Sequence, residues 1–248
     1  DQCDVAVTPT QWQLQQFPAH LQSKIKVIFD GIDTNFFRHG VVEGDLRLHD
    51  EVTGHPFVFP PERRILSYAT RGMEPVRGFP EFMRMLPPLL EYFGDLDVVI
   101  AGRDRSAYSY PAPGCNGSWK QWMLQELRSC CDTSRIYFTG LLNFGEYRQL
   151  LWRTNLHCYF SRSYITSWGL FQAVACGTSL LLNQDPCVDY VLSRQMASWV
   201  DLDDSRGLLA QAISVLDKPI QHNKPTLSPD FSIASSIKSW QFLLNSLL

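Results

Sequence analysis

Hydrophobic residues along this chain gather in short continuous runs, and amphipathic stretches separate one run from the next. A short run that is apolar throughout is typical of a strand buried on both faces, as in a parallel sheet. The runs that predict strands are residues 25–29, 65–69, 98–101, 136–139, 156–160, 179–182 and 198–200. Residues 4–10 also read as a strand, followed by a residue suited to cap a helix.

Helical periodicity fills the stretches between the strands. Apolar residues recur every three or four positions over residues 79–93, where Pro87 and Pro88 predict a kink. Similar stripes occupy residues 208–216 and 233–248. The alternation of strands and helices predicts an α/β fold, with a doubly wound parallel sheet covered by helices on both faces.

Three segments rich in proline or polar residues interrupt this alternation. Residues 40–62 and 217–232 are interpreted as connectors. Residues 103–118 follow the carboxyl end of a strand, where open α/β sheets bind ligands. This segment therefore either covers a binding site or is a solvent loop, and the sequence leaves both interpretations open.

Composition narrows the classes of function. The net charge is −3 and only 19% of the residues are charged, so nucleic acid is not an expected partner. The seven cysteines are odd in number and form no CxxC pair, which favours free thiols in a reducing cytoplasm over a zinc site. No apolar stretch approaches the ~20 residues of a membrane span. Because the sequence opens within a predicted strand, we expect a piece of a longer polypeptide.

Two arginines bracket a loop between a predicted strand and a predicted helix. Arg71 and Arg77 flank Gly72 in the segment 68–79. Backbone N–H groups and guanidinium forks that meet at one point suit a diphosphate. The alternative is a pair of surface arginines in an ordinary loop, and spacing alone does not decide between the two.

A second candidate site lies at residues 160–177, where a strand runs into a polar loop and a helix begins near Ser167. Ser167 is predicted to cap this helix, and Gly169 lets a ligand approach the backbone. The exposed N–H groups of the first turn form an anion site. Gln172 lies one turn further in, within reach of a ribose diol, and Gly177 ends the helix. The alternative is a capped core helix without a ligand.

Taken in order, these motifs resemble the C-terminal half of family 4 glycosyltransferases, which have the GT-B architecture. The resemblance runs from about residue 4 to residue 216 and includes a similarity to bacterial polysaccharide-type members. Its motifs are Asp30-Gly31-Ile32-Asp33, Arg71 with Arg77-Gly78, Val98-Val99-Ile100-Ala101-Gly102, Phe138-Thr139-Gly140, the strand that ends in Ser161, and Gln172-Ala173-Val174-Ala175-Cys176-Gly177.

The resemblance implies transfer of a sugar from a nucleotide donor to an acceptor hydroxyl, with retention of configuration and without a metal. Arg71 and Arg77 would hold the diphosphate and stabilise its charge as it leaves. Gln172 would hold the ribose, and the backbone of Leu141 and Leu142 would meet the base edge. The implied donor site comprises Gly72, Gly102, Arg103, Gly140, Leu141, Leu142, Ser167, Trp168, Gly169 and Gln172, besides the two arginines.

The chain departs from the family at two positions. Family members usually carry two glutamates, one toward the donor sugar and one toward the ribose, where this chain has Tyr164 and Gln172. Glutamine can still hydrogen-bond a diol, but without charge assistance. Two alternatives therefore stay open: a degenerate, non-catalytic GT-B subunit, and a GT-B nucleotide-sugar epimerase. An epimerase usually needs an acid and a base near the sugar, and this half shows no convincing pair.

The same resemblance suggests how the chain is divided. Residues 1–34 would end the N-terminal half and enter the next, 35–216 would form the Rossmann-like donor-binding domain, and 217–248 would form a linker and C-terminal helix. The expected partners are a nucleotide sugar, with a UDP-sugar slightly favoured, a saccharide or glycolipid acceptor, and the chain's own N-terminal GT-B half. No cofactor is expected. The expected location is the cytoplasm, or the inner face of the membrane if the missing half binds there. The expected process is polysaccharide biosynthesis. The isolated chain is expected to be inactive.

Four further side chains invite functional interpretation, and we expect structural roles for them. His157 lies in a predicted strand among apolar residues, so a packed and satisfied histidine is expected. Glu74 and Asp104 are expected to face solvent. Trp119 lies on a helical stretch and is expected in the core.

Overall fold

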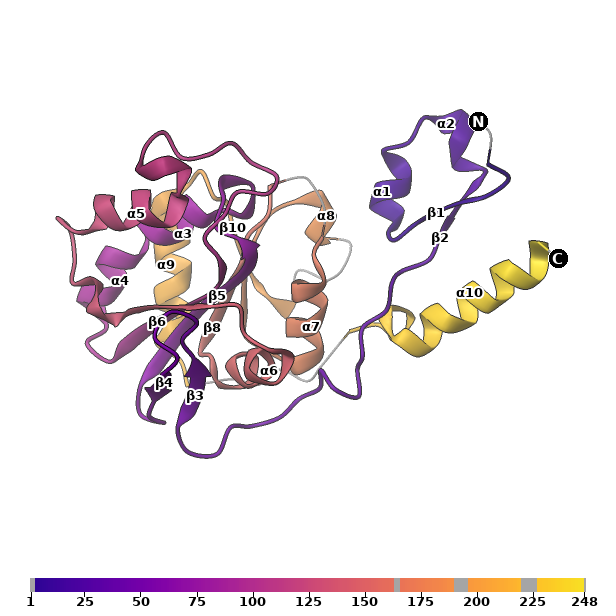
Figure 1. Ribbon diagram of the computed structural model, residues 1–248. Coiled ribbons are helices and arrows are strands. Elements are labelled where there is room, and N and C mark those ends of the chain that lie inside the picture. Colours follow the sequence, from indigo (N-terminus) through magenta and orange to yellow (C-terminus); the bar gives the residue numbers. More distant parts are fainter. Residues whose placement is uncertain (1–2, 163–165, 190–195, 220–226, 248) are drawn as a thin grey trace.

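The computed structural model describes residues 3–162, 166–189, 196–219 and 227–247. Figure 1 shows a central sheet with helices on both faces, and a smaller group of elements from the two ends of the chain beside it. No described helix is long and apolar enough to cross a membrane.

Six parallel strands form the central sheet, in the order β10-β9-β8-β5-β6-β7. They are β5 (Arg64–Gly72), β6 (Leu96–Arg103), β7 (Ile136–Gly140), β8 (Leu156–Tyr159), β9 (Leu180–Asn183) and β10 (Ser198–Val200). The chain first builds β6 and β7 on one side of β5, then returns to add β8, β9 and β10 on the other. This arrangement confirms the doubly wound parallel sheet.

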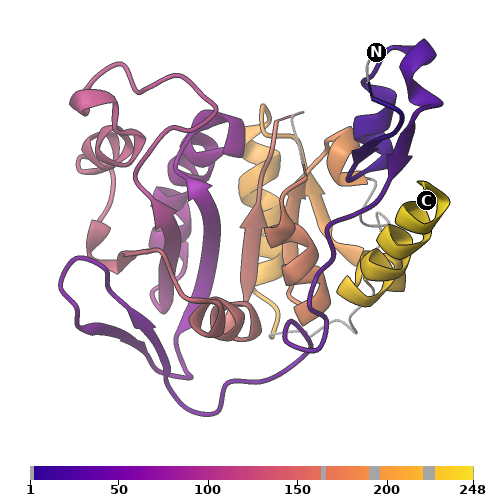
Figure 2. The same ribbon diagram turned by 45° about the vertical axis from the view of Figure 1, so that its right-hand side comes forward.

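Helices cover both faces of the sheet, and Figure 2 shows the sheet between them. They are α3 (Phe79–Arg84), α4 (Leu86–Tyr92), α5 (Trp119–Leu127), α6 (Phe144–Arg153), α7 (Trp168–Cys176), α8 (Pro186–Asp189) and α9 (Ser205–Leu216). Leu66 and Tyr68 of β5 join the core under α3, α4, α5 and α9, and that core includes Trp119. Leu182 of β9 joins the opposite core under α6 and α7. The predicted core position of Trp119 is confirmed.

The predicted kink in the helix over residues 79–93 is a break between α3 and α4. It lies at Met85, just before Pro87 and Pro88. Proline lacks a backbone N–H and is tolerated in the first turn of a helix, so two prolines here end one helix and begin the next.

The interpretation of residues 40–62 as a mere connector was wrong, because they contain an antiparallel hairpin. Its strands are β3 (Leu46–His49) and β4 (Pro56–Phe59). Leu46, Leu48 and Phe59 are fully or almost fully buried and pack against the sheet. Leucine alternates with polar residues along β3, which is the period of a half-buried strand; the surrounding polar residues and prolines obscured it.

The first residues form a small unit separate from the central sheet. It comprises β1 (Ala6–Thr8), α1 (Gln11–Gln15), α2 (Ala19–Gln22) and β2 (Ile25–Val27), with β1 and β2 parallel. The Thr10 hydroxyl accepts a hydrogen bond from the Gln13 N–H at 3.2 Å and so caps α1. The predicted opening of a strand followed by a helix cap is confirmed.

The last helix, α10 (Ile233–Leu247), lies on the same side of the central domain as this small unit in both views. The chain passes from the small unit to the central domain near Ile32, and it comes back to the same side near Phe231, beside the first crossing. The two crossings are hydrogen-bonded: the Ile32 N–H donates to the Phe231 carbonyl at 2.8 Å, and the Ile233 N–H donates to the Ile32 carbonyl at 3.0 Å. Gly31 has a φ of +91°, and a Cβ there would lie 2.7 Å from the Ile233 Cα, so the close crossing depends on glycine.

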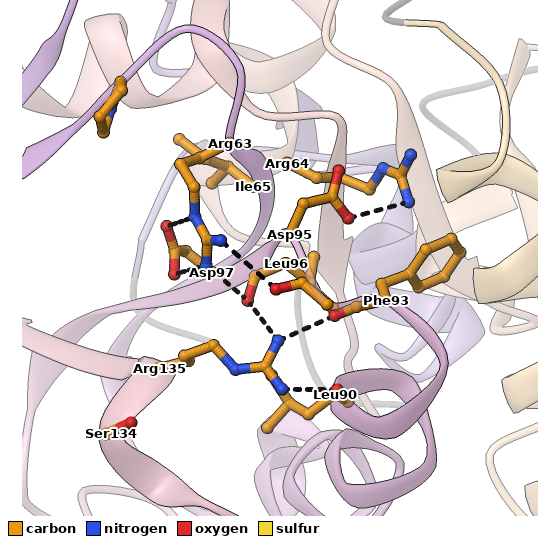
Figure 3. A network of polar contacts seen from close by, with 12 residues as sticks. Arg63, Arg64, Ile65, Leu90, Phe93, Asp95, Leu96, Asp97, Ser134 and Arg135 are labelled. Atoms are coloured by element: carbon orange, nitrogen blue, oxygen red, sulfur yellow. Dashed lines mark hydrogen bonds and ion pairs between the residues drawn. The ribbon is translucent and has the colours of Figure 1, made fainter.

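Three arginines at the amino ends of the strands are held by partners, as Figure 3 shows. Arg63 forms a bidentate ion pair with Asp97, with N···O distances of 2.6 and 2.8 Å. Arg64 lies 3.4 Å from Asp95. Arg135 donates to the carbonyls of residues 90, 93 and 96. At this end of the sheet, the three arginines are therefore bound by other residues of the protein.

Candidate donor-binding site

The carboxyl ends of β5, β6 and β8 open onto a cavity of about 560 Å³. It lies where the strand order turns back at β5, the place at which open α/β sheets bind ligands. Its volume falls in the ~300–1,000 Å³ range of small-molecule sites. The predicted residues that line it are Arg71, Arg77, Gly102, Leu141, Leu142, Ser167, Trp168, Gly169 and Gln172.

The segment after β5 places both arginines on the cavity. Arg71 is exposed, and it makes no hydrogen bond or ion pair with any other described residue. Arg77 is only 8% exposed, at the end of the 3-10 turn η1 (Pro75–Arg77). The next residue, Gly78, has a φ of +63°, and a Cβ there would lie 2.5 Å from the Phe160 Cβ. Glycine thus lets the arginine segment turn tightly against the end of β8.

Helix α7 points its first turn at the same cavity. Ser167 stands at the N-cap position, but its side chain makes no capping bond. Its N–H lies 2.9 Å and its hydroxyl 3.3 Å from the Tyr159 hydroxyl. The prediction that the Ser167 side chain caps α7 was wrong because Tyr159 holds it instead. The first N–H groups of a helix lack intrahelical partners, so this terminus can still receive an anion.

Two further residues of α7 line the cavity. Gln172 is half-buried, one turn inside the helix. The Trp168 indole N–H donates to a carboxylate oxygen of Asp30 at 3.0 Å, and Asp30 also lines the cavity. The Asp30-Gly31-Ile32-Asp33 turn is therefore attached to the start of α7. The other position where a family glutamate is usual, Tyr164, lies outside the described residues.

The turn after β7 is already engaged by a carboxylate. The Leu141 N–H donates to a Glu51 carboxylate oxygen at 3.1 Å, and the Glu51 N–H donates to the Thr139 carbonyl at 3.1 Å. Gly140 has a φ of +72°, and any Cβ there would overlap the Glu51 side chain. Leu141 and Leu142 line the cavity, but the Leu141 N–H, expected to meet a base edge, has an internal partner here.

Three predicted site residues do not line the cavity: Gly72, Arg103 and Gly140. Gly72 is buried, and a Cβ there would lie 2.7 Å from the Arg105 carbonyl oxygen. Arg103, its partner in the β5–β6 ladder, is exposed. Gly72 thus allows the chain to pack closely against Arg105, whereas a contact with the ligand was predicted for it.

The expectation that Glu74 faces solvent was wrong. Glu74 is 1% exposed, and one of its carboxylate oxygens accepts the N–H groups of Ala107, Tyr108 and Ser109 at 2.8–2.9 Å. Its partners lie more than thirty residues away in sequence, so no local pattern indicated them. Asp104 behaves as expected: it is exposed, and its carboxylate accepts from the Ser118 hydroxyl.

Burial keeps three ionisable side chains at the end of β8 neutral: His157, Cys158 and Tyr159. Burial raises the pKa of the Cys158 thiol and of the Tyr159 phenol, so neither supplies an anionic nucleophile at neutral pH. In the same strand, burial lowers the pKa of His157 to about 4, and its Nδ1 lies 2.8 Å from the Ser67 hydroxyl. The expected packed and satisfied histidine is confirmed. Among the described residues, no group of three or more His, Cys, Asp or Glu could hold a metal ion.

Sequence reasoning missed several residues on the cavity wall, including Thr70, Tyr108, Tyr147 and Tyr159. Three of these are tyrosines, whose large apolar rings gave no signal that separates a cavity wall from a core. Tyr108 belongs to the segment 103–118, for which a covering role was one of two open interpretations. The structure brings one of its side chains to the cavity.

Comparisons with known proteins agree with this architecture. Sucrose-phosphate synthase from Thermosynechococcus elongatus has a similar fold, with a TM-score of 0.68 and 12% identity over 99% of this chain and 58% of that one. Anabaena HepE in complex with UDP gives a TM-score of 0.64 and 11% identity, over 98% and 64% of the two chains. The C-terminal domain of the group 1 glycosyl transferase LpcC from Francisella tularensis gives 0.56 and 11%, over 84% and 97%.

The fold of this chain is similar to that of GT-B glycosyltransferases. Residues 1–37 match the sequence model of the glycosyl transferase family 4 group. No curated protein matches the chain by sequence. The chain spans 58% and 64% of the length of the first two solved structures described above.

Proposed function

We propose that this chain binds the nucleotide-sugar donor of a glycosyltransferase that transfers a sugar to an acceptor hydroxyl with retention. One observation carries the proposal: Arg71, Arg77 and the first turn of α7 converge on a single cavity at the switch point of the sheet. Arg71 has no partner among the described residues, so its guanidinium is available to a ligand.

The chemistry of these groups suits a nucleoside diphosphate leaving group. Two guanidinium groups and a helix N-terminus supply positive charge where the diphosphate gains negative charge as the sugar departs. They would act as catalytic groups because they would contact the oxygens of the departing diphosphate. The resemblance to family 4 glycosyltransferases adds retention of configuration and independence from metal.

The remaining parts of the donor are assigned to the walls of the same cavity. Gln172 would bind the ribose, and Leu141 with Leu142 would border the base. A UDP-sugar is slightly favoured, and the similar HepE structure, which contains UDP, supports that choice.

The acceptor would be a saccharide or glycolipid that binds mostly to an N-terminal GT-B half. In this proposal residues 1–34 end that half, residues 35–216 form the donor-binding domain, and residues 217–248 form a linker and C-terminal helix. The likeness to LpcC, whose solved chain is described as a C-terminal domain, supports this division. The proposed setting is polysaccharide biosynthesis in the cytoplasm or at the inner membrane face. Residues 1–248 alone should not transfer sugar, because positioning both reactants contributes about 7–11 kcal/mol.

One observation favours a second candidate, a degenerate GT-B subunit that binds no donor productively. Gln172 lines the cavity where family members usually have a glutamate. An epimerase has less support, because Asp30 is the one carboxylate on the described cavity wall and it is bonded to Trp168.

A thermal-shift screen of UDP, GDP and ADP tests the proposal. A ligand at 100 times its Kd stabilises the folded state by about 2.7 kcal/mol, so at least one of the three should raise the melting temperature by several degrees. No shift with any of them at millimolar concentration would contradict donor binding and favour the degenerate subunit. Product analysis with the full-length enzyme then separates transfer from epimerisation.

A further inference from the structure

Glu74 is a buried carboxylate with an unusual set of partners. It lies midway between Arg71 and Arg77 in the arginine segment and is 1% exposed. A single oxygen, Oε2, accepts three consecutive backbone N–H groups at 2.9, 2.8 and 2.9 Å. Consecutive N–H groups that converge on one point are the geometry with which backbone binds an anion, and here the anion is a side chain of the protein itself.

Apolar burial does not explain how the segment 105–109 is held in place. Ala107 and Tyr108 are exposed, and the other three residues are only half-buried. Polar contacts fix the segment at several points: Glu74 accepts three backbone N–H groups, the Arg105 N–H donates to the Arg103 carbonyl at 2.9 Å, and the Val76 N–H donates to the Ser109 hydroxyl at 3.0 Å. Each residue fixed in one conformation costs about 1–2 kcal/mol of backbone entropy, so a segment without a core needs such bonds.

The segment held in this way forms part of the cavity wall. Tyr108, the middle of the three residues bound by Glu74, lines the cavity together with Thr70, Arg71 and Gly102. Its phenol ring is a flat, largely apolar surface on the same cavity that Arg71 and Arg77 line. Aromatic rings placed next to phosphate-binding groups stack on nucleobases without strong preference for one base.

We propose that the Tyr108 ring stacks on the nucleoside of the donor and that Glu74 is the positioning residue that holds Tyr108 at the cavity. This inference rests on the proposed donor-binding function. Glu74 itself does not touch the ligand. One buried carboxylate thereby fixes the nucleoside wall to the segment that carries the two diphosphate arginines, so both parts of the donor meet a pre-organised surface.

Calorimetric titrations of UDP and of inorganic pyrophosphate into five proteins test this inference. The proteins are the unmodified chain, Tyr108→Ala, Glu74→Ala, the double variant, and Asp104→Ala. Asp104→Ala is the matched control, because it also removes a carboxylate next to the same segment, but from the solvent side. Base–aromatic stacking supports an expected loss of about tenfold in UDP affinity for Tyr108→Ala.

Glu74→Ala should lose UDP affinity to a similar extent, and the double variant should lose little more, because both changes remove the same wall. Pyrophosphate affinity should stay within about twofold in all five proteins. Glu74→Gln, which keeps an oxygen acceptor, should recover much of the UDP affinity. Hydrogen exchange at residues 107–109 should be faster in Glu74→Ala and near normal in Glu74→Gln.

Four results would overturn the inference. A lower melting temperature for Glu74→Ala with unchanged UDP affinity would make Glu74 merely structural. Equal losses of affinity for UDP and for pyrophosphate in Glu74→Ala would mean that Glu74 acts through the diphosphate arginines and not through Tyr108. Unchanged UDP affinity in Tyr108→Ala would contradict the stacking role of Tyr108. This measurement does not depend on whether the Glu74 variants fold. An unmodified chain that binds neither ligand would overturn the proposed function, and this inference with it.

Discussion

The two ends of the central sheet both carry arginines, and they use them differently. At the amino end, Arg63, Arg64 and Arg135 are held by carboxylates or carbonyls (Figure 3). At the carboxyl end, Arg71 reaches the cavity without a partner among the described residues, and Arg77 borders the same cavity. The residue type is the same, so the pairing state separates the three arginines that stabilise the fold from Arg71, whose guanidinium is available to a ligand.

The largest effect should come from the paired end. Arg63→Ala leaves Asp97, which is 4% exposed, without its ionic partner. Breaking a buried pair on one side costs about 3–5 kcal/mol, and Arg63 is partly exposed, so we expect a loss near 3 kcal/mol in urea unfolding with UDP affinity unchanged. Arg47→Ala, which breaks the exposed pair with Asp45, is the control and should cost less than about 1 kcal/mol. Equal costs for the two variants would contradict the assignment.

The next effect concerns His157, buried in β8 between the two ends. Burial holds its pKa at about 4 in the folded chain, against an ordinary value of 6.5. As pH falls, the unfolded chain takes up the proton first, so the stability due to neutral His157 is complete above pH 6.5 and is lost progressively down to about pH 4. At about 1.4 kcal/mol per pKa unit, the loss is about 3 kcal/mol at most.

Urea unfolding between pH 7 and pH 4.5 measures this loss, and His157→Gln should flatten the dependence in that window. An unaltered slope in the variant would mean that other groups govern acid destabilisation.

At the cavity, Arg77→Ala should weaken UDP binding by about 1.5–3 kcal/mol, the contribution of a charge-assisted hydrogen bond. Stability measured without ligand is the necessary second readout, because Arg77 is mostly buried. Titration calorimetry at a temperature well below the melting temperature of the variant, where the variant is folded, separates the two effects. A variant that folds and binds UDP as tightly as the parent would remove Arg77 from the donor site.

The smallest effect should come from Gln172→Glu. A carboxylate accepts from both ribose hydroxyls, whereas glutamine has one acceptor group. Repulsion from the diphosphate offsets part of the gain, so UDP binding should tighten by roughly 1 kcal/mol, several-fold in affinity. The 2′-deoxy analogue should gain much less. Equal gains for both ligands would show that residue 172 does not face the diol.

Much of the fold could be predicted from periodicity because buried parallel strands are continuously apolar. All six strands of the central sheet were predicted within a few residues of their bounds, and so was the break before Pro87. The β3–β4 hairpin was missed because its short alternation lies among polar residues and prolines.

The site could be predicted only in part. A motif indicates which backbone segments lie near the site, but it does not specify the partner of each side chain. Gly72 packs against Arg105, and the Ser167 hydroxyl bonds to Tyr159. Glu74 is the clearest case: its partners at residues 107–109 are set by how the chain folds back. No local pattern encodes such a long-range contact.

The most direct test of the account is calorimetric titration of UDP into the unmodified chain, Arg71→Ala and Arg63→Ala. Arg71 is exposed and unpaired among the described residues, so its replacement should leave the melting temperature nearly unchanged. The account predicts that Arg71→Ala loses about tenfold or more in UDP affinity at unchanged stability, while Arg63→Ala loses stability at unchanged affinity. Equal UDP affinity in the unmodified chain and Arg71→Ala would contradict the placement of the donor diphosphate at the carboxyl end of the sheet.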